Sequence, residues 1–248
     1  METVLGRSRL DAGRGPVFVV VGVFDGLHRG HVYLLEQLVR VASERGARPT
    51  VITFDAHPDA ILTGHAPPLL MDPAERLDRL AAAGIETVVI EHFDDALRMT
   101  PYDTFVEGIS SRCGLAGILM TPDSAFGHNR AGTPTTVAAL GAREGFDVVV
   151  VPPFGLDGRE VRSSDIRAAI AAGHLVDAER LLGRPYAVVG HADATGRVTF
   201  PMPVALPPPG EYRVAGRGRA AVTPAGTLEL ALPAAPGRVR LEFAAAST

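Results

Sequence analysis

The first 184 residues alternate short apolar runs with segments in which apolar residues recur at helical spacing. The runs lack the apolar-polar alternation of a half-exposed strand, and such continuous runs are typical of parallel strands covered on both faces. Five runs of this kind predict strands at residues 16–22, 51–54, 87–90, 117–120 and 148–151.

Helical patterns lie between these runs. After Gly30, apolar residues at positions 32, 35, 39 and 42 keep helical spacing. Asp72-Pro73, Thr100-Pro101 and Thr133-Pro134 are typical helix starts, with a capping residue followed by proline. The β-α alternation predicts an α/β domain over residues 1–184, with a doubly wound, Rossmann-like parallel sheet.

The composition changes after residue 184. Residues 185–248 contain nine of the 20 prolines. Short apolar stretches predict strands at 186–190, 197–200, 212–215, 227–232 and 239–243, and residues 244–248 are expected to be a frayed end. We therefore expect a second, small β-barrel-like domain at 185–248, which would be marginal alone because so short a chain buries little core.

The loop most suited to chemistry follows the first strand. Residues 22–31 read G-V-F-D-G-L-H-R-G-H, and ligands of open α/β sheets bind beyond the carboxyl ends of the strands. Glycines permit close backbone approach, and the start of the next helix favours an anion. His28 and His31, three residues apart, could both face one phosphate. Surface or capping histidines and a zinc site are the alternatives, but no matching cluster of zinc ligands occurs elsewhere.

Composition narrows the possible functions. The 24 basic and 28 acidic residues give a net charge of -4, which favours neither nucleic acid nor an anionic membrane surface. The sequence contains no lysine, which excludes a Walker phosphate loop and Schiff-base chemistry. A single cysteine excludes an internal disulfide. No apolar run is long enough to span a membrane and no secretory leader is evident, so a cytoplasmic protein is expected.

Four motifs in order resemble the adenylyltransferase domain of bacterial FAD synthetases, the bifunctional riboflavin kinase/FMN adenylyltransferases of the nucleotidylyltransferase superfamily. The loop at 22–31 is similar to their G-x-F-D-G-x-H-x-G-H signature. Residues 53–58 resemble T-F-x-P-H-P, residues 123–132 resemble D-F-x-F-G-x-x-R-x-G, and residues 161–167 resemble I-S-S-T-x-I-R. Residues 182–186, L-G-R-P-Y, resemble the junction at which the kinase domain begins.

The resemblance implies transfer of AMP from ATP to FMN, which yields FAD and pyrophosphate. The partners would be ATP and FMN or another phosphorylated small molecule. Mg²⁺ would arrive largely on the ATP phosphates, and no residue is assigned as its ligand. The implied catalytic residues are His28, His31 and Arg167, with Arg167 on the leaving pyrophosphate. The implied nucleotide-binding residues are Gly22, Phe24, Asp25, Gly26, Gly30, Ser163 and Ser164. The implied flavin-binding residues are His57, Asp123, Phe126, Gly127 and Arg130.

Several of these residues also have a purely structural interpretation. The two serines could simply cap a helix, and Arg167 could be a solvated helix residue. Asp25 could orient a histidine or approach the magnesium-nucleotide.

Departures from the family pattern affect the acceptor and the tail. Ala56, Ser124 and Ala125 differ from the family around the flavin side, which leaves the acceptor open. Residues 199–204, T-F-P-M-P-V, lack the threonine and asparagine of the kinase G-F-P-T-A-N motif. We expect adenylyl transfer without riboflavin kinase activity; a related nucleotidylyltransferase with another acceptor, or a non-catalytic flavin- or nucleotide-binding regulator, is the alternative. The sequence does not predict an oligomeric state.

Overall fold

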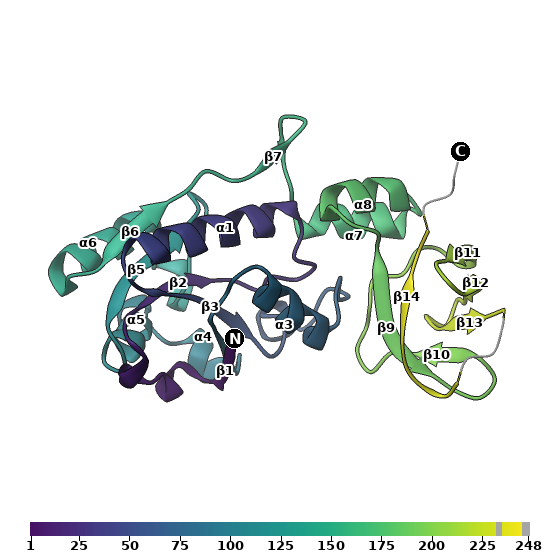
Figure 1. Cartoon of the computed structure of the whole chain (residues 1–248), viewed down its shortest axis with the longest axis horizontal. Helices are drawn as coiled ribbons and strands as arrows, with labels where there is room; N and C mark the ends of the chain where they lie inside the picture. The colour runs from purple at the N-terminus through teal and green to yellow at the C-terminus, as the bar shows by residue number, and fades with distance from the viewer. Residues whose placement is uncertain (232–234, 245–248) are drawn as a thin grey trace. The chain divides into compact units, whose positions relative to one another are not determined.

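A computed structural model describes residues 1–231 and 235–244 (Figure 1). A six-stranded sheet has the order β1-β4-β3-β2-β5-β6, and every neighbouring pair is parallel. Its strands are Glu2–Leu5 (β1), Val17–Val21 (β2), Arg48–Phe54 (β3), Thr87–Glu91 (β4), Leu115–Met120 (β5) and Asp147–Val150 (β6).

The five apolar runs are confirmed as strands, and β1 is an addition. Residues 17–20 of β2 are all buried, as a strand covered on both faces requires. In β1, by contrast, half-buried and exposed residues alternate, and the strand pairs with β4 at the edge of the sheet. A four-residue strand of this kind carries no continuous apolar run, so the pattern that identifies buried strands did not detect it.

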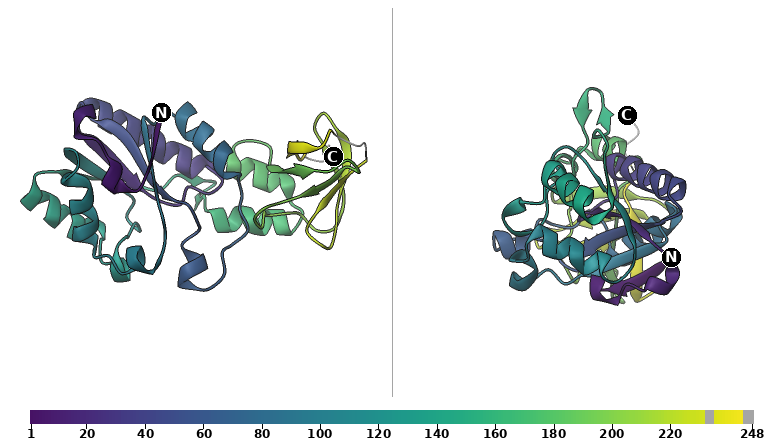
Figure 2. Two further views of the ribbon diagram at one scale, coloured as in Figure 1. Left: turned by 90° about the horizontal axis from the view of Figure 1, so that it is seen from below. Right: turned by 90° about the vertical axis from the view of Figure 1, so that its left-hand side faces the viewer.

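Helices lie on both faces of the parallel sheet (Figure 2). Phe105 and Ile109 of α5 and Leu140 of α6 pack in one core cluster with alternate residues of the strands. On the opposite face, the guanidinium of Arg45, just after α1, lies over the ring of Phe18, 5.3 Å from its centroid. The predicted fold class is therefore confirmed.

The helix starts follow local capping chemistry. Thr133 forms a capping box with Thr136, and Pro134 is the first residue of α6. The Asp72 carboxylate accepts the backbone N–H groups of residues 74 and 75 at the start of α3. The helices are Arg29–Glu44 (α1), Asp59–Leu62 (α2), Pro73–Ala82 (α3), Asp95–Arg98 (α4), Tyr102–Ser110 (α5), Pro134–Glu144 (α6), Ser163–Ala171 (α7) and Leu175–Leu182 (α8). Short 3₁₀ helices lie at Arg7–Arg9, Ala12–Arg14 and His128–Arg130.

The chain divides into two compact units. The first unit comprises Met1–Phe24, His31–Pro67 and Leu77–Phe154 and contains the parallel sheet. The second unit comprises Asp25–Gly30, Pro68–Arg76 and Gly155–Thr248. The predicted domain boundary between residues 184 and 185 stays a prediction.

The second unit contains an antiparallel sheet of order β11-β12-β13-β10-β9-β14. Its strands are Ala187–Ala192 (β9), Arg197–Thr199 (β10), Gly210–Val214 (β11), Gly218–Val222 (β12), Leu228–Leu230 (β13) and Gly237–Glu242 (β14), and a small hairpin joins Gly155–Leu156 (β7) to Arg159–Glu160 (β8). The sequence did not predict β12. Leu232 of one predicted strand and residues 245–248 of the predicted frayed end lie outside the described residues.

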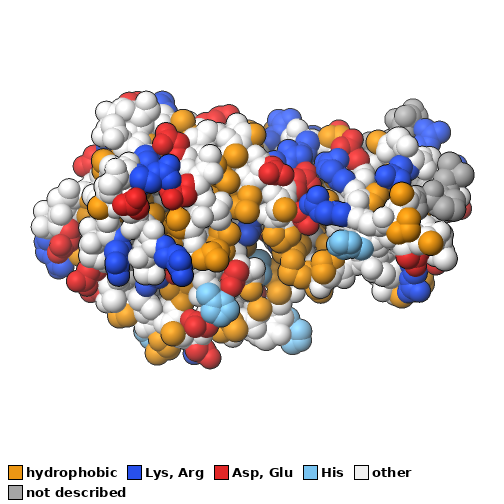
Figure 3. Space-filling model, turned by 60° about the horizontal axis from the view of Figure 1, so that its bottom comes forward, with side chains coloured by type: hydrophobic (Ala, Val, Ile, Leu, Met, Phe, Trp, Pro, Cys, Tyr) orange, Lys and Arg blue, Asp and Glu red, His pale blue; other side chains and the backbone are white. Residues whose placement is uncertain are grey.

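The surface carries charges of both signs close together. On the face drawn in Figure 3, blue side chains, which are all arginine because the chain contains no lysine, neighbour red carboxylates. Arg40 pairs with Glu44 at 2.7 Å, and Arg45 pairs with Asp147 at 2.8 Å. None of the helices in the described ranges is long and apolar enough to cross a membrane.

Candidate functional site

A pocket of about 570 Å³ lies at the carboxyl ends of the central parallel strands. The chain order of the sheet reverses here, since β3 and β4 lie on one side of β2 while β5 and β6 lie on the other. Residues that follow β2 and β5 line the pocket, among them Gly22, Val23 and Asp123. Open α/β sheets bind their ligands at such a switch point, so this pocket is the candidate ligand site of the first unit.

The wall of the pocket is largely aromatic and aliphatic. Four phenylalanines contribute to it: Phe54 meets Phe93 edge-on at 5.2 Å between ring centroids, and Phe105 lies 5.5 Å from Phe126. A pocket of this size and lining is suited to a flat aromatic ligand with a few polar groups.

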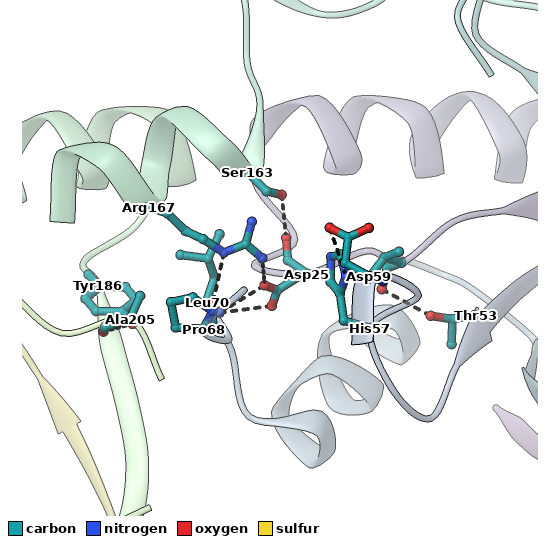
Figure 4. A network of polar contacts seen from close by, with 11 residues as sticks. Asp25, Thr53, His57, Asp59, Pro68, Leu70, Ser163, Arg167, Tyr186 and Ala205 are labelled. Carbon is teal, nitrogen blue, oxygen red and sulfur yellow. Dashed lines mark hydrogen bonds and ion pairs between the residues drawn. The ribbon is translucent and has the colours of Figure 1, made fainter. Parts of the chain in front are cut away.

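All five residues that the sequence assigned to the flavin side line this one pocket. His57 lines the pocket, and its Nδ1 accepts the N–H of Asp59 at 3.2 Å (Figure 4). Arg130 donates through Nη2 to the carbonyl of Asp123 at 3.3 Å. Phe126 and Gly127 also line it. The structure therefore brings these residues together, and their role in binding a flavin stays a prediction.

Ser124 is one of the lining residues that depart from the family pattern. Its Oγ accepts the backbone N–H of Thr121 at 2.9 Å and lies 2.8 Å from the Thr121 hydroxyl. The side chain is thus used to close a local turn after β5, next to Ala125, which also lines the pocket. Two small side chains at this part of the wall leave more room than an aromatic side chain would.

The second unit contains the loop of residues 25–30, which carries His28. Gly26 has φ +79°, and an added Cβ there would lie 3.0 Å from side-chain atoms of Leu70. Gly30 is required for space, since a Cβ there would lie 3.2 Å from the His28 ring and 3.3 Å from the carbonyl of Val161. Any larger residue at position 30 would press on the imidazole.

Asp25 forms the centre of a buried polar network, drawn in Figure 4. Its carboxylate, 5% exposed, pairs with Arg167 Nη2 at 2.5 Å and accepts the N–H of Leu70 at 3.0 Å. Arg167 also donates through Nε to the carbonyl of Pro68 at 2.8 Å. The alternative that Arg167 is a solvated helix residue is therefore wrong, because the guanidinium is largely buried and held at two of its nitrogens. Among the described residues, Nη1 is the donor that this network leaves for a ligand.

Ser163 is the first residue of α7, and it also contacts the loop. Its hydroxyl donates to the carbonyl of Asp25 at 3.1 Å. The residue that caps α7 is Arg162, without a side-chain hydrogen bond to the helix. The interpretation of Ser163 as a simple helix cap is therefore wrong, while Ser164 lies exposed on the first turn of α7.

His28 is buried and electrically neutral at physiological pH. Burial, followed by the positive charges of Arg184 and Arg167, lowers its pKa from 6.5 to about 4. A neutral imidazole presents an N–H donor without a fixed charge, and a bound phosphate would favour its protonation.

His31 and Phe24 lie in the first unit. His31 is on the first turn of α1, and its ring lies 5.1 Å from that of Phe24. Phe24 is 2% exposed and adopts φ +54°, so it is a packed residue of the turn after β2. Its predicted role in binding the nucleotide stays untested.

No metal centre is evident in the described part of the chain. Among residues 1–231 and 235–244, no group of three or more His, Cys, Asp or Glu side chains is arranged to hold a metal ion. The carboxylate of Asp25, which was a candidate for contact with magnesium-nucleotide, is instead engaged by Arg167 and Leu70.

Two residues that contact the loop at residues 25–30 were not predicted from the sequence. Arg184 donates to the carbonyls of Gly26 and Leu27, and the N–H of Leu70 reaches Asp25. The L-G-R-P-Y motif around Arg184 was interpreted only as a junction. For Leu70, whose contribution is a backbone N–H, no sequence signal exists.

Comparison with known proteins agrees with the geometry. The sequence profile of the family described as FAD synthetase matches residues 12–165. Two bifunctional riboflavin kinase/FMN adenylyltransferases, from Pseudomonas fluorescens and Escherichia coli (strain K12), are each 31% identical to this chain. The matches cover 77% and 74% of this chain but 61% and 60% of the relatives, so the chain spans about three fifths of the length of these curated relatives.

A solved structure shares the fold. The macrolide-efflux protein from Streptococcus pneumoniae superposes with a TM-score of 0.80 over 98% of this chain and 90% of its own, at 22% sequence identity. That identity supports the fold alone. The family profile, however, covers more than half of the sequence, and its range includes the His28 loop, the lined pocket and Ser163. The chain therefore belongs to the FAD synthetase family.

Proposed function

We propose that the chain is an FMN adenylyltransferase that transfers AMP from ATP to FMN, yields FAD and pyrophosphate, and has no riboflavin kinase activity. A cytoplasmic location, expected from the sequence, is part of this proposal. The pocket of the first unit carries it, because a cavity with four phenylalanines at the switch point of a parallel sheet suits the tricyclic ring of a flavin.

The polar residues of the pocket support a phosphorylated, partly polar acceptor. Arg98 and Arg130 both line it and supply positive charge, and His57 supplies a further polar group. Arginine forms forked hydrogen bonds with phosphate and with carbonyl groups, so the pocket can hold an aromatic ring and polar substituents together.

The loop at residues 25–30 supports the nucleotide chemistry. An oxygen of the FMN phosphate attacks the α-phosphorus of ATP; a P–O bond forms as the bond to the β-phosphate breaks, and pyrophosphate leaves with the electron pair. Such a transfer depends on positioning and charge stabilisation. The N–H of His28 and Nη1 of Arg167 are donors for the phosphate oxygens, and the start of α7 at Ser163 adds backbone N–H groups.

Magnesium enters this proposal as part of the substrate, MgATP. The phosphate chain of ATP supplies the oxygen ligands that Mg²⁺ prefers. Asp25 is assigned to hold Arg167 rather than the metal, since its carboxylate already accepts hydrogen bonds from Arg167 and Leu70.

The absence of riboflavin kinase activity rests on residues 201–204. Pro201 and Pro203 have no N–H group for an anion, and the Pro203 carbonyl accepts the N–H of Leu69 at 2.9 Å. Val204 forms a β-bridge with Leu69. The backbone of this segment is thus used for packing within the second unit.

A second acceptor is favoured by one observation, the small side chains at Ser124 and Ala125 in the pocket wall. They could admit another phosphorylated ring compound. Purified protein incubated with FMN and MgATP, followed by chromatography, separates the possibilities. FAD and pyrophosphate in equal amounts support the proposal. Pyrophosphate release only with another acceptor supports the second function, and tight flavin binding without turnover supports a regulator.

A further inference from the structure

Two consecutive residues of the His28 loop have left-handed backbone conformations. Gly26 adopts φ +79°, and Leu27 adopts φ +38° with a side chain that is 3% exposed. A leucine with positive φ is conformationally unfavourable and persists only where the surrounding contacts fix it. The loop therefore needs a structural restraint immediately before His28.

Arg184 supplies contacts at this point. Its Nη2 donates to the carbonyl of Gly26 at 2.5 Å, and its Nη1 donates to the carbonyl of Leu27 at 3.0 Å. Nη1 also lies 3.4 Å from the carbonyl of Leu182 at the end of α8. The guanidinium thus joins the two left-handed residues to the last turn of a helix through a rigid fork, which the ammonium of a lysine cannot reproduce.

The position of Arg184 is itself fixed by its neighbours. Gly183 ends α8 in the left-handed conformation, φ +76°, and a Cβ at Gly183 would lie 3.0 Å from Cγ of Arg29. Pro185 and the buried Tyr186 follow, and the Tyr186 hydroxyl donates to the carbonyl of Ala205 at 2.5 Å. The backbone on both sides of Arg184 is therefore held in place, by Gly183 before it and by Tyr186 after it.

The charge of Arg184 also acts on His28. After burial, it is the largest cause of the lowered pKa of His28, ahead of Arg167. Arg167, the other charge that lowers this pKa, is itself paired with the Asp25 carboxylate.

We propose that Arg184 is a positioning residue for adenylyl transfer, which fixes the backbone of Gly26 and Leu27 and so presents the His28 imidazole to the nucleotide. The part of this inference that concerns His28 rests on the proposed function. Arg184 itself acts through the loop, because its guanidinium donates to the backbone carbonyls of Gly26 and Leu27.

The first test is independent of activity. The pKa of the His28 ring is measured by NMR titration of the ligand-free full chain, with His28→Gln to assign the signal. We expect a pKa near 4 in the parent protein and a clearly higher pKa in Arg184→Ala. Arg184→Lys keeps the charge but not the fork, so its backbone amide signals at residues 26–28 should shift while the pKa rises less. Arg180→Ala removes an exposed arginine of α8 that pairs with Asp157, and it should change neither quantity.

The second test distinguishes an effect of Arg184 on ATP binding from an effect on the rate of turnover. Because misplacement of a catalytic group by about 1 Å can cost about 10²-fold in rate, Arg184→Ala should lose about that factor in kcat with a smaller change in KM for ATP. Arg184→Lys should retain part of the rate, and Arg180→Ala all of it. An unchanged kcat and an unchanged His28 pKa in a folded Arg184→Ala would overturn the proposal. Failure of the parent protein to form FAD would refute the proposed function, and the titration would still decide the role of Arg184.

Discussion

Replacing Asp25 with alanine is expected to destabilise the protein by about 3–5 kcal/mol, the usual cost of breaking a buried ion pair by removal of one partner. The Asp25 side chain is 5% exposed and that of Arg167 is 16% exposed, so water can compensate neither charge well. The variant leaves the guanidinium of Arg167 without its carboxylate and the N–H of Leu70 without its acceptor.

The lost ion pair with Arg167 and the lost hydrogen bond from Leu70 contribute separately to this destabilisation. An unsatisfied buried N–H costs about 1–3 kcal/mol, so the larger part of the loss comes from the uncompensated charge of Arg167. Asp25→Asn keeps an oxygen for Leu70 and removes only the charge, and it should therefore be less destabilising than Asp25→Ala. At about 2–4 °C per kcal/mol for a chain of this size, the midpoint of thermal unfolding in Asp25→Ala should fall by about 6–20 °C.

A double-mutant cycle tests this reasoning. The free energy of unfolding is measured in urea for the parent protein, Asp25→Ala, Arg167→Ala and the double variant. Because the double variant removes both partners of this ion pair, it should be less destabilised than the sum of the single variants, by about 2 kcal/mol. Costs that add to within about 0.5 kcal/mol would show that the two side chains are energetically independent and would refute the argument.

Three further outcomes are expected. His28→Ala should lower kcat by about 10²–10³-fold with little change in KM for ATP, since the charge that the ring meets develops in the transition state; a loss confined to KM would contradict this role. The pKa of His28 in the folded state is lowered from 6.5 to about 4, so between these pH values the unfolded state binds a proton that the folded state does not. The free energy of unfolding should therefore fall as pH falls from about 6.5 towards 4, by at most about 1.4 kcal/mol per pH unit. Denaturation in urea at several pH values should show a weaker decline in His28→Gln. Riboflavin and MgATP should yield no FMN, because Pro201 and Pro203 offer no N–H donors, and FMN detected by chromatography would contradict this.

Local patterns in the sequence were sufficient to predict most of the elements. Continuous apolar runs identified β2 to β6, and the Thr133-Pro134 pair identified the start of α6. The edge strand β1 and the strand β12 were missed because neither contains a continuous run of large apolar residues. β1 depends on pairing with the distant strand β4, whereas β12 pairs with its neighbours in the sequence, β11 and β13.

In the candidate site, too, some residues could be predicted from sequence motifs and others could not. Motif resemblance identified His57, Phe126 and Arg130, and the structure places all three in one pocket. The hydrogen bonds that hold Arg167 and Arg184 join residues 142 and 158 positions apart in the chain. Their acceptors include backbone carbonyls, which carry no residue-specific signal, so only the folded chain reveals them.

Adenylyl transfer to FMN is tested most directly by following the phosphorus atoms of ATP. The purified chain is incubated with FMN, magnesium and ATP labelled at either the α- or the γ-phosphate, and the products are separated by chromatography. The account predicts that the α-label appears in FAD and the γ-label in pyrophosphate, in equal amounts, and that His28→Ala greatly slows both. Release of ADP or free phosphate with no label in FAD would contradict it.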